Sequence, residues 1–166
     1  MNLALMIIDL QKAFYDDESR HSMDSACEYI NAILPVFRKA KLPIFWIQHI
    51  DEEDGVVPGT DGFEFISLLQ PEEGEHRIHK KYGNSFNKTN GIDIINEKNV
   101  DTVIITGYCA EHCILSTYRG ALDHDLTPII LKHGIAGNNQ RNIEFVEDIS
   151  ELITYGALKK ILEERL

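Results

Sequence analysis

Short runs of apolar residues recur along the chain and predict its strands. Four of these runs have no polar alternation and are aliphatic or β-branched: residues 3–9 (LALMIID), 43–49 (PIFWIQH), 100–106 (VDTVIIT) and 127–132 (TPIILK). Runs of this kind are typical of strands that are covered on both faces. The pattern therefore predicts a buried, mostly parallel sheet.

Segments with helical periodicity separate these runs. One apolar stripe marks the helix that is expected over residues 22–40: Ala26, Ile30, Ile33, Leu34 and Phe37. Pro35 is expected to kink this helix. Further helices are expected over residues 110–123, 142–153 and 157–166. The alternation of strands and helices predicts the α/β class, with three layers around a mostly parallel sheet.

The composition narrows the class of partner. With 166 residues, 43% of them hydrophobic, the chain is expected to form a single domain over residues 1–166 with room for a pocket. No stretch reaches the ~18 apolar residues of a membrane span, and the N-terminal residues do not resemble a signal peptide, so a cytoplasmic protein is expected. The net charge of -11 repels phosphate backbones and anionic lipids. Neither nucleic acid nor membrane is therefore an expected partner.

Parallel α/β sheets bind ligands at the carboxyl ends of their strands, and three places in the chain qualify: Asp9, the pair Lys80 and Lys81, and the loop before Cys113. Asp9 ends the first apolar run and is either a functional carboxylate or a turn cap. Alternation places Lys80 on the inward face with Ile78, whereas Lys81 points outward. A buried lysine needs a partner or a task, although a solvated edge-strand lysine that prevents aggregation is the alternative.

The chain has three cysteines, an odd number that suits free thiols in a reducing compartment. Cys113 lies in the first turn of an expected helix, where the helix dipole and unpaired N–H groups are expected to lower its thiol pKa. The alternative is a small buried hydrophobic residue, which applies strongly to Cys27 on its apolar stripe. Cys109 lies in a loop and is less readily assigned to a core.

A metal site or a redox pair is another interpretation of the two neighbouring cysteines. Zinc ligands could come from Cys109, His112, Cys113 and His49, but cysteines four residues apart do not match the usual ligand spacing and no second pair follows. A thioredoxin-type pair has two intervening residues, and this pair has three. Neither spacing favours these interpretations.

Three motifs occur in order along the chain: IIDLQKAF (residues 7–14), IHKKYGNSF (78–86), and VIITGYCAEHCILST (103–117) with GALD (120–123). Together they resemble the isochorismatase-like cysteine hydrolases, the superfamily that includes nicotinamidases and N-carbamoylsarcosine amidohydrolase. The similarity spans nearly the whole chain. It implies a Rossmann-like α/β/α fold whose six-stranded sheet has the order 3-2-1-4-5-6.

The resemblance also implies a role for individual residues. Asp9 matches the general base of the family, Lys80 its active-site lysine, and Cys113 its nucleophile. A cis peptide bond is implied between Tyr108 and Cys109. The backbone N–H groups of Cys109 and Cys113 would then stabilise the oxyanion.

The implied activity is hydrolysis of a C–N, amide-type bond of a small molecule through a thioester on Cys113. Substrate contacts are expected from Phe14, Phe86 and the loop over residues 51–62. Nicotinamidases of the superfamily hold a divalent metal with an aspartate and two histidines after the second strand, where this chain offers only His49. No metal and no other cofactor are therefore expected.

Two other functions stay open at this level. The chain could be an isochorismatase-type hydrolase of another small substrate, or a non-catalytic member of the fold that binds small molecules. The resemblance also implies a homo-oligomer, either a dimer or a tetramer. A chain this short leaves its pocket shallow unless a neighbouring subunit closes it.

Overall fold

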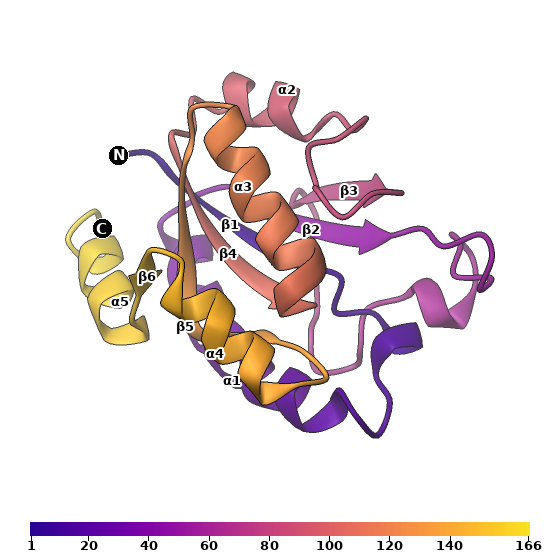
Figure 1. Cartoon of the computed structure of the whole chain (residues 1–166). Helices are drawn as coiled ribbons and strands as arrows, with labels where there is room; N and C mark the ends of the chain where they lie inside the picture. The colour runs from indigo at the N-terminus through magenta and orange to yellow at the C-terminus, as the bar shows by residue number, and fades with distance from the viewer.

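The computed structural model describes residues 1–166 and has a six-stranded sheet, which lies at its centre (Figure 1). The strand order is β3-β2-β1-β4-β5-β6 and every pairing is parallel, which confirms the order that the resemblance implies. The strands are β1 (Leu3–Ile8), β2 (Ile44–His49), β3 (His76–Lys80), β4 (Thr102–Tyr108), β5 (Thr127–Ala136) and β6 (Leu152–Ile153).

Helices cover both faces of the sheet and complete three layers. One face packs against α1 and α5, and the other packs against α2, α3 and α4. Alternate residues of β1 enter the two cores, so that this strand is buried along its whole length. The helices are α1 (Arg20–Lys39), α2 (Gly91–Glu97), α3 (Leu115–Asp123), α4 (Gln140–Asp148) and α5 (Tyr155–Glu163).

The chain departs from the predicted pattern after α4. A helix was expected over residues 142–153, but α4 ends at Asp148 and the last two residues of that range form β6. They pair with Ile130 and Leu131 of β5. The prediction is wrong there because an edge of the sheet captures a segment that is too short to show a strand pattern of its own.

The longest helix, α1, contains Pro35 and continues to Lys39. Its predicted stripe is buried: Ala26, Ile30, Ile33, Leu34 and Phe37. Three short helical turns also occur in the loops: η1 (Lys12–Phe14), η2 (Asp61–Phe63) and the π-helical η3 (Ala110–Ile114). Across the whole chain, no helix combines the length and the apolar character that crossing a membrane requires.

A glycine lets the two central strands meet closely at the carboxyl end of the sheet. Gly107 has a φ of +119°, and a Cβ at this position would collide with the carbonyl oxygen of Ile8. The pairing of β4 with β5 also changes register between Ile105 and Gly107. Because a side chain would not fit between the strands, glycine at position 107 allows the ends of β1 and β4 to lie this close.

Candidate active site

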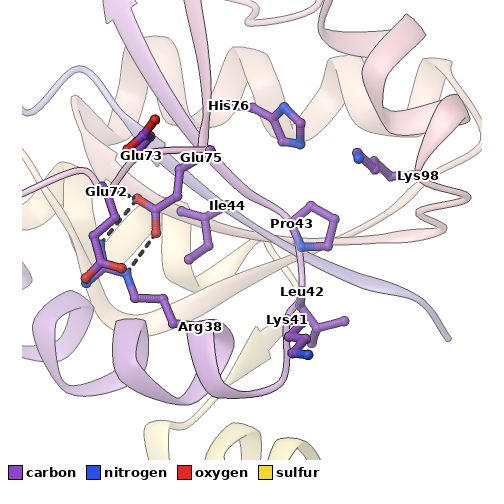
Figure 2. Close-up of a pocket in the computed structure, with 11 residues that line it drawn as sticks. Arg38, Lys41, Leu42, Pro43, Ile44, Glu72, Glu73, Glu75, His76 and Lys98 are labelled. Carbon is purple, nitrogen blue, oxygen red and sulfur yellow. Dashed lines mark hydrogen bonds and ion pairs between the residues drawn. The ribbon is translucent and has the colours of Figure 1, made fainter.

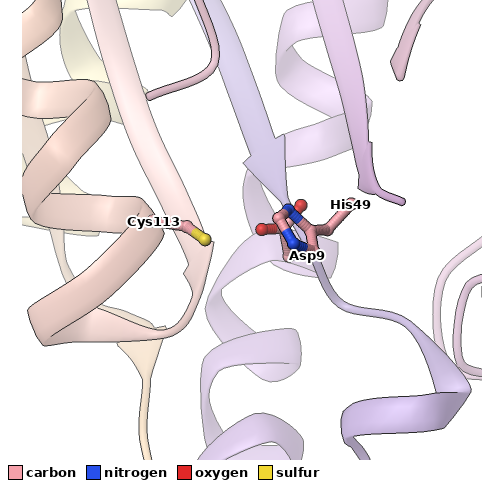
Figure 3. Close-up of side chains that lie close together, drawn as sticks. All are labelled: Asp9, His49 and Cys113. Atoms are coloured by element: carbon pink, nitrogen blue, oxygen red, sulfur yellow. The ribbon is translucent and has the colours of Figure 1, made fainter. Parts of the chain in front are cut away.

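Three polar side chains meet at the carboxyl end of the sheet. Asp9 follows β1, Lys80 ends β3, and Cys113 lies in η3 after β4. The Lys80 ammonium lies 2.7 Å from Oδ2 of Asp9 and 3.3 Å from Sγ of Cys113. In Figure 3 the sulfur of Cys113 faces the Asp9 carboxylate. The structure thus brings together the three residues to which the resemblance gives roles.

Lys80 reaches the other two residues across the end of β2. Its strand is at the edge of the sheet, and β2 lies between it and β1. Strands are spaced about 4.8 Å apart, so about 10 Å separates β1 from β3. The long lysine side chain spans this gap, with Nζ 3.1 Å from Nδ1 of His49, the last residue of β2. Nζ also donates to the carbonyl oxygen of Tyr82 at 3.0 Å.

Alternation along β3 separates the two candidate lysines as predicted. Ile78 and Lys80 are buried, whereas Lys81 is exposed and forms an ion pair with Glu52. A buried ammonium needs partners, and Lys80 has them. Lys80 is therefore the lysine that lies next to Asp9 and Cys113.

Asp9 has one oxygen that is bound and one that is free. Oδ2 accepts a hydrogen bond from Lys80, whereas Oδ1 is buried without any hydrogen-bond partner. The side chain caps no helix, because η1 begins after Gln11 without a side-chain cap. The backbone of Asp9 has a φ of 53°, which is uncommon for a residue with a Cβ. A buried carboxylate oxygen without a hydrogen-bond partner is costly, and it leaves Oδ1 able to accept a proton.

The environment of Cys113 differs from the one that was expected at a helix start. Burial, followed by the charge of Asp9, raises the pKa of the thiol to about 12, although Lys80 lowers it. The expected lowering of this pKa is therefore wrong, because desolvation of the thiolate outweighs the favourable contacts. Cys113 lies in a π-helical turn, a rare geometry that is frequent at functional sites. At neutral pH the resting group is a thiol that needs a base.

Gln11 and His49 complete the polar surroundings. Gln11 is fully buried, and its side-chain amide accepts from the His49 N–H at 2.6 Å and donates to the His49 carbonyl at 3.0 Å. Burial, followed by Lys80, lowers the pKa of His49, which keeps the imidazole neutral. Sequence reasoning considered His49 only as a metal ligand and missed Gln11. The available signal was a glutamine two residues after Asp9 in the first motif.

The loop after β4 carries the second thiol. The Tyr108–Cys109 peptide bond is cis, at the position that the resemblance implies. Cys109 donates from Sγ to Oε2 of Glu111 at 3.2 Å, and Oε1 of Glu111 accepts from Asn142 at 2.7 Å. Burial, followed by the bond to Glu111, raises the pKa of the Cys109 thiol to about 12. Cys109 is thus held as a protonated donor.

The two phenylalanines that were expected to bind substrate have different surroundings. Phe14 stacks on Tyr108 with ring centres 5.8 Å apart, and its ring centre lies 6.4 Å from that of His49. Phe86 is buried in the core and packs edge-on against His124. Phe14 lies beside the site, whereas a substrate contact by Phe86 stays a prediction.

Asp9, His49 and Cys113 also offer three possible metal-ligand atoms within 4.8 Å of one another. The Lys80 ammonium, however, contacts all three side chains at 2.7, 3.1 and 3.3 Å. A metal ion would have to displace a cation that is already bound by the same atoms. The donor set therefore fits the lysine better than it fits a metal.

A second group of possible ligands lies in the loop after β4 and in η3. It consists of Cys109, Glu111 and His112, of which His112 is exposed. The thiol in this group already donates to the carboxylate. The four residues that were considered as zinc ligands are thus divided between two groups, which argues against a single zinc site.

The main cavities of the single chain lie away from these residues. None of the five main cavities is lined by Asp9, Lys80 or Cys113. One cavity of about 350 Å³ opens at the opposite end of the sheet, where β2 and β3 begin (Figure 2). An ion pair between Arg38 and Glu75 crosses its lining. The candidate active site therefore lies outside these five cavities.

The fold and the site define a class, the isochorismatase-like α/β fold with an aspartate, a lysine and a cysteine at the carboxyl end of its sheet. Residues 3–147 match the family model of the Isochorismatase domain. The uncharacterized isochorismatase family protein YrdC of Bacillus subtilis is 32% identical over 119 residues, which are 70% of this chain and 64% of YrdC. The chain therefore belongs to the isochorismatase family.

Solved structures share the fold over nearly the whole chain. An isochorismatase-like hydrolase from Alkaliphilus metalliredigens has a TM-score of 0.89 at 22% identity, covering 97% of this chain and 99% of that one. N-carbamoylsarcosine amidase from Thermoplasma acidophilum has a TM-score of 0.81 at 20% identity, covering 93% and 97%. The predicted three-layer α/β fold is thereby confirmed.

Proposed function

We propose that this chain is a cysteine hydrolase that cleaves a C–N, amide-type bond of a small molecule through a thioester on Cys113. The observation that carries the proposal is the bonding around Asp9. The Lys80 ammonium donates to one oxygen of this carboxylate and lies 3.3 Å from the sulfur of Cys113, while the other oxygen is buried without a partner. Membership of the isochorismatase family supports the same reaction class.

In this mechanism, the free Oδ1 of Asp9 takes the proton of Cys113. Because burial raises the thiol pKa to about 12, the proton leaves as the sulfur attacks the carbonyl carbon rather than beforehand. The Lys80 ammonium, 3.3 Å from the sulfur, stabilises the negative charge during transfer. A base and a cation thus act together on a thiol that is not ionised at rest.

The remaining steps use the same groups. The backbone N–H groups of Cys109 and Cys113 hold the oxyanion of the tetrahedral intermediate. Protonated Asp9 then gives its proton to the leaving nitrogen, ammonia or an amine departs, and the acyl group stays on the sulfur. Water that is deprotonated by Asp9 attacks the thioester, which releases the acid and restores the thiol.

A small, uncharged substrate suits the charges around the site. The three N–H bonds of Lys80 face protein acceptors already. Lys12 and Lys81 on neighbouring segments are paired with Asp61 and Glu52. None of these lysines is left to neutralise a substrate carboxylate, which favours neutral amides, ureas and carbamoyl compounds.

We also propose a homo-oligomer, a dimer or a tetramer, that acts on a small molecule in the cytoplasm without nucleic-acid or membrane partners. A neighbouring subunit would deepen a site that no main cavity of the single chain reaches. The three cysteines are free, which suits a reducing compartment. Light scattering tests the assembly, and a fully active monomer would contradict it.

Release of ammonia or amine from a panel of small amides, ureas and carbamoyl compounds tests the activity. With an active substrate, mass spectrometry of acid-quenched enzyme should show an acyl adduct on Cys113. Turnover without any adduct would contradict the thioester. If the folded protein binds members of the panel but turns over none of them, a non-catalytic binding role becomes the better explanation.

A further inference from the structure

Lys80 has more acceptors around it than protons to give. A lysine ammonium carries three N–H bonds. Four acceptors lie within reach of Nζ: Oδ2 of Asp9 at 2.7 Å, the Tyr82 carbonyl oxygen at 3.0 Å, Nδ1 of His49 at 3.1 Å and Sγ of Cys113 at 3.3 Å. The carboxylate and the carbonyl are permanent acceptors. His49 and Cys113 therefore compete for the third N–H.

The contact with Lys80 also fixes the state of His49. An ammonium can only donate, so Nδ1 of His49 accepts and the ring carries its proton on Nε2. Burial and Lys80 lower the pKa of His49, which agrees with a neutral ring. The clamp by Gln11 holds the backbone of His49 from both sides, at 2.6 and 3.0 Å. His49 is thus a fixed acceptor next to the nucleophile.

The balance of this competition changes with the charge on the sulfur. A thiol is a weak acceptor, so the resting third N–H belongs to His49. A thiolate is charged and accepts far more strongly. We propose that His49 is a positioning residue. It accepts the third N–H hydrogen bond of Lys80 at rest, and this N–H turns to the sulfur of Cys113 as the thiolate forms, without leaving Lys80. This inference rests on the proposed role of Cys113 as the nucleophile.

One consequence is that His49 favours the protonated thiol, because its bond to Lys80 is given up when the thiolate forms. The charged groups that act on the thiol are Asp9, which follows β1, and Lys80 at the end of β3; both also act on His49, as does Asp51 from the loop after β2. Asp9, Lys80 and His49 surround the sulfur of Cys113. Of these three, only His49 can be replaced without removing a proposed catalytic group.

Two substitutions of His49 distinguish the effect of its hydrogen-bond acceptor from the effect of its size. His49→Phe removes the acceptor and keeps a ring beside Phe14, whereas His49→Gln keeps an acceptor oxygen. The measurement is the rate of Cys113 alkylation by iodoacetamide, followed by peptide mass spectrometry from neutral to alkaline pH. Peptide mapping separates Cys113 from the other two cysteines. His79→Phe, on the opposite face of β3, is a control for changes near Lys80 in sequence.

We expect the His49→Phe substitution to lower the apparent pKa of Cys113 by about one unit, which gives about tenfold more thiolate at a given pH. Alkylation below that pKa should become about three- to fourfold faster, because a less basic thiolate is also a weaker nucleophile. The His49→Gln and His79→Phe variants should keep the wild-type profile.

An unchanged profile in His49→Phe would overturn the inference. Faster alkylation in both the Phe and the Gln variants would also overturn it, because the cause would then be a wider opening. If circular dichroism shows that His49→Phe does not fold, His49→Leu provides the same comparison. A dead Cys113→Ala enzyme with an unchanged His49→Phe profile would refute only the role of His49, whereas an active Cys113→Ala enzyme would refute the proposed function itself.

Discussion

Two ion pairs at opposite ends of the sheet differ in what they leave unbonded. At the carboxyl ends, the side chains of Lys80 and Asp9 are 0% and 2% exposed, and Oδ1 of Asp9 has no partner. Where β2 and β3 begin, the side chains of Arg38 and Glu75 are 24% and 11% exposed, and they line the cavity of Figure 2. The pair with one unbonded oxygen, Oδ1 of Asp9, is therefore also the more deeply buried pair.

Both oxygens of Glu75 are bonded. Oε1 accepts from Arg38, and Oε2 accepts from Arg38, from the Trp46 indole and from the backbone N–H of Glu72. Burial raises the pKa of Glu75, but these bonds outweigh it and the net pKa is lowered. Such a carboxylate has no capacity left for a proton near neutral pH. The comparison teaches that the reactive pair differs from the structural one in two ways: it is more deeply buried, and one of its carboxylate oxygens has no hydrogen-bond partner.

The largest effect on turnover should come from replacing Cys113, at the carboxyl ends of the strands. Cys113→Ala should abolish turnover, because no other group in contact with Lys80 can form the thioester. The fold should persist, since alanine replaces a side chain of similar size. Amine release and circular dichroism check both points. Turnover retained by a folded Cys113→Ala enzyme would refute the mechanism.

Asp9→Asn tests the unpaired oxygen directly. An amide can still accept from Lys80 but cannot take the thiol proton, so turnover should fall by about 10²- to 10⁴-fold. The buried ammonium also loses its charge partner, and the free energy of unfolding should drop by up to about 3–5 kcal/mol. Turnover and urea unfolding are measured on the same variant. Near-normal turnover would place Asp9 with Glu75 as a structural carboxylate.

Glu75→Gln should show the opposite behaviour, with turnover per folded molecule unchanged and stability reduced by about 1–3 kcal/mol. The net pKa of folded Glu75 is below its ordinary value of 4.5. Its contribution to stability is therefore present above that pH and is lost as pH falls through the folded pKa. Urea unfolding at neutral and acidic pH should show wild type losing more stability on acidification than the variant. Equal losses would contradict the assignment.

The parts of the fold that follow from local pattern could be predicted from the sequence. Four strands appear as apolar runs, and alternation alone put Lys80 inside and Lys81 outside, as the structure has them. β6 could not be predicted, because its two residues become a strand only through pairing with β5. The helix was expected there because the apolar residues have helical periodicity, but pairing with β5 in the folded protein makes the last two residues a strand.

The candidate active site likewise has residues that the sequence predicts and features that only the structure shows. The motifs point to Asp9, which ends an apolar run, and to Cys113, which lies at the start of the helix that is expected after another apolar run. The clamp of Gln11 on His49 depends on how the ends of β1 and β2 lie side by side, which no local pattern contains. The raised pKa of Cys113 likewise depends on tertiary burial, so the helix position alone gave the wrong direction.

The smallest effect should separate the two neighbouring thiols. Cys109 has no step of its own in the mechanism, and its backbone N–H is kept by alanine. Its thiol is protonated and makes one weak hydrogen bond to Glu111, which still accepts from Asn142 when the thiol is gone. Cys109→Ala should therefore change turnover by less than about fivefold, the equivalent of about 1 kcal/mol.

Amine release by Cys109→Ala and Cys113→Ala, measured side by side, checks this difference. Cys27→Ala is the matched control, because its thiol is buried on the stripe of α1 and a substitution there should affect only stability. If the variants at positions 109 and 113 are both folded and equally inactive, the two thiols act as a pair, and a redox or metal function becomes the better explanation. If only the variant at 113 is inactive, the free oxygen of Asp9 serves a single nucleophile, because the other thiol is already committed to a carboxylate of its own.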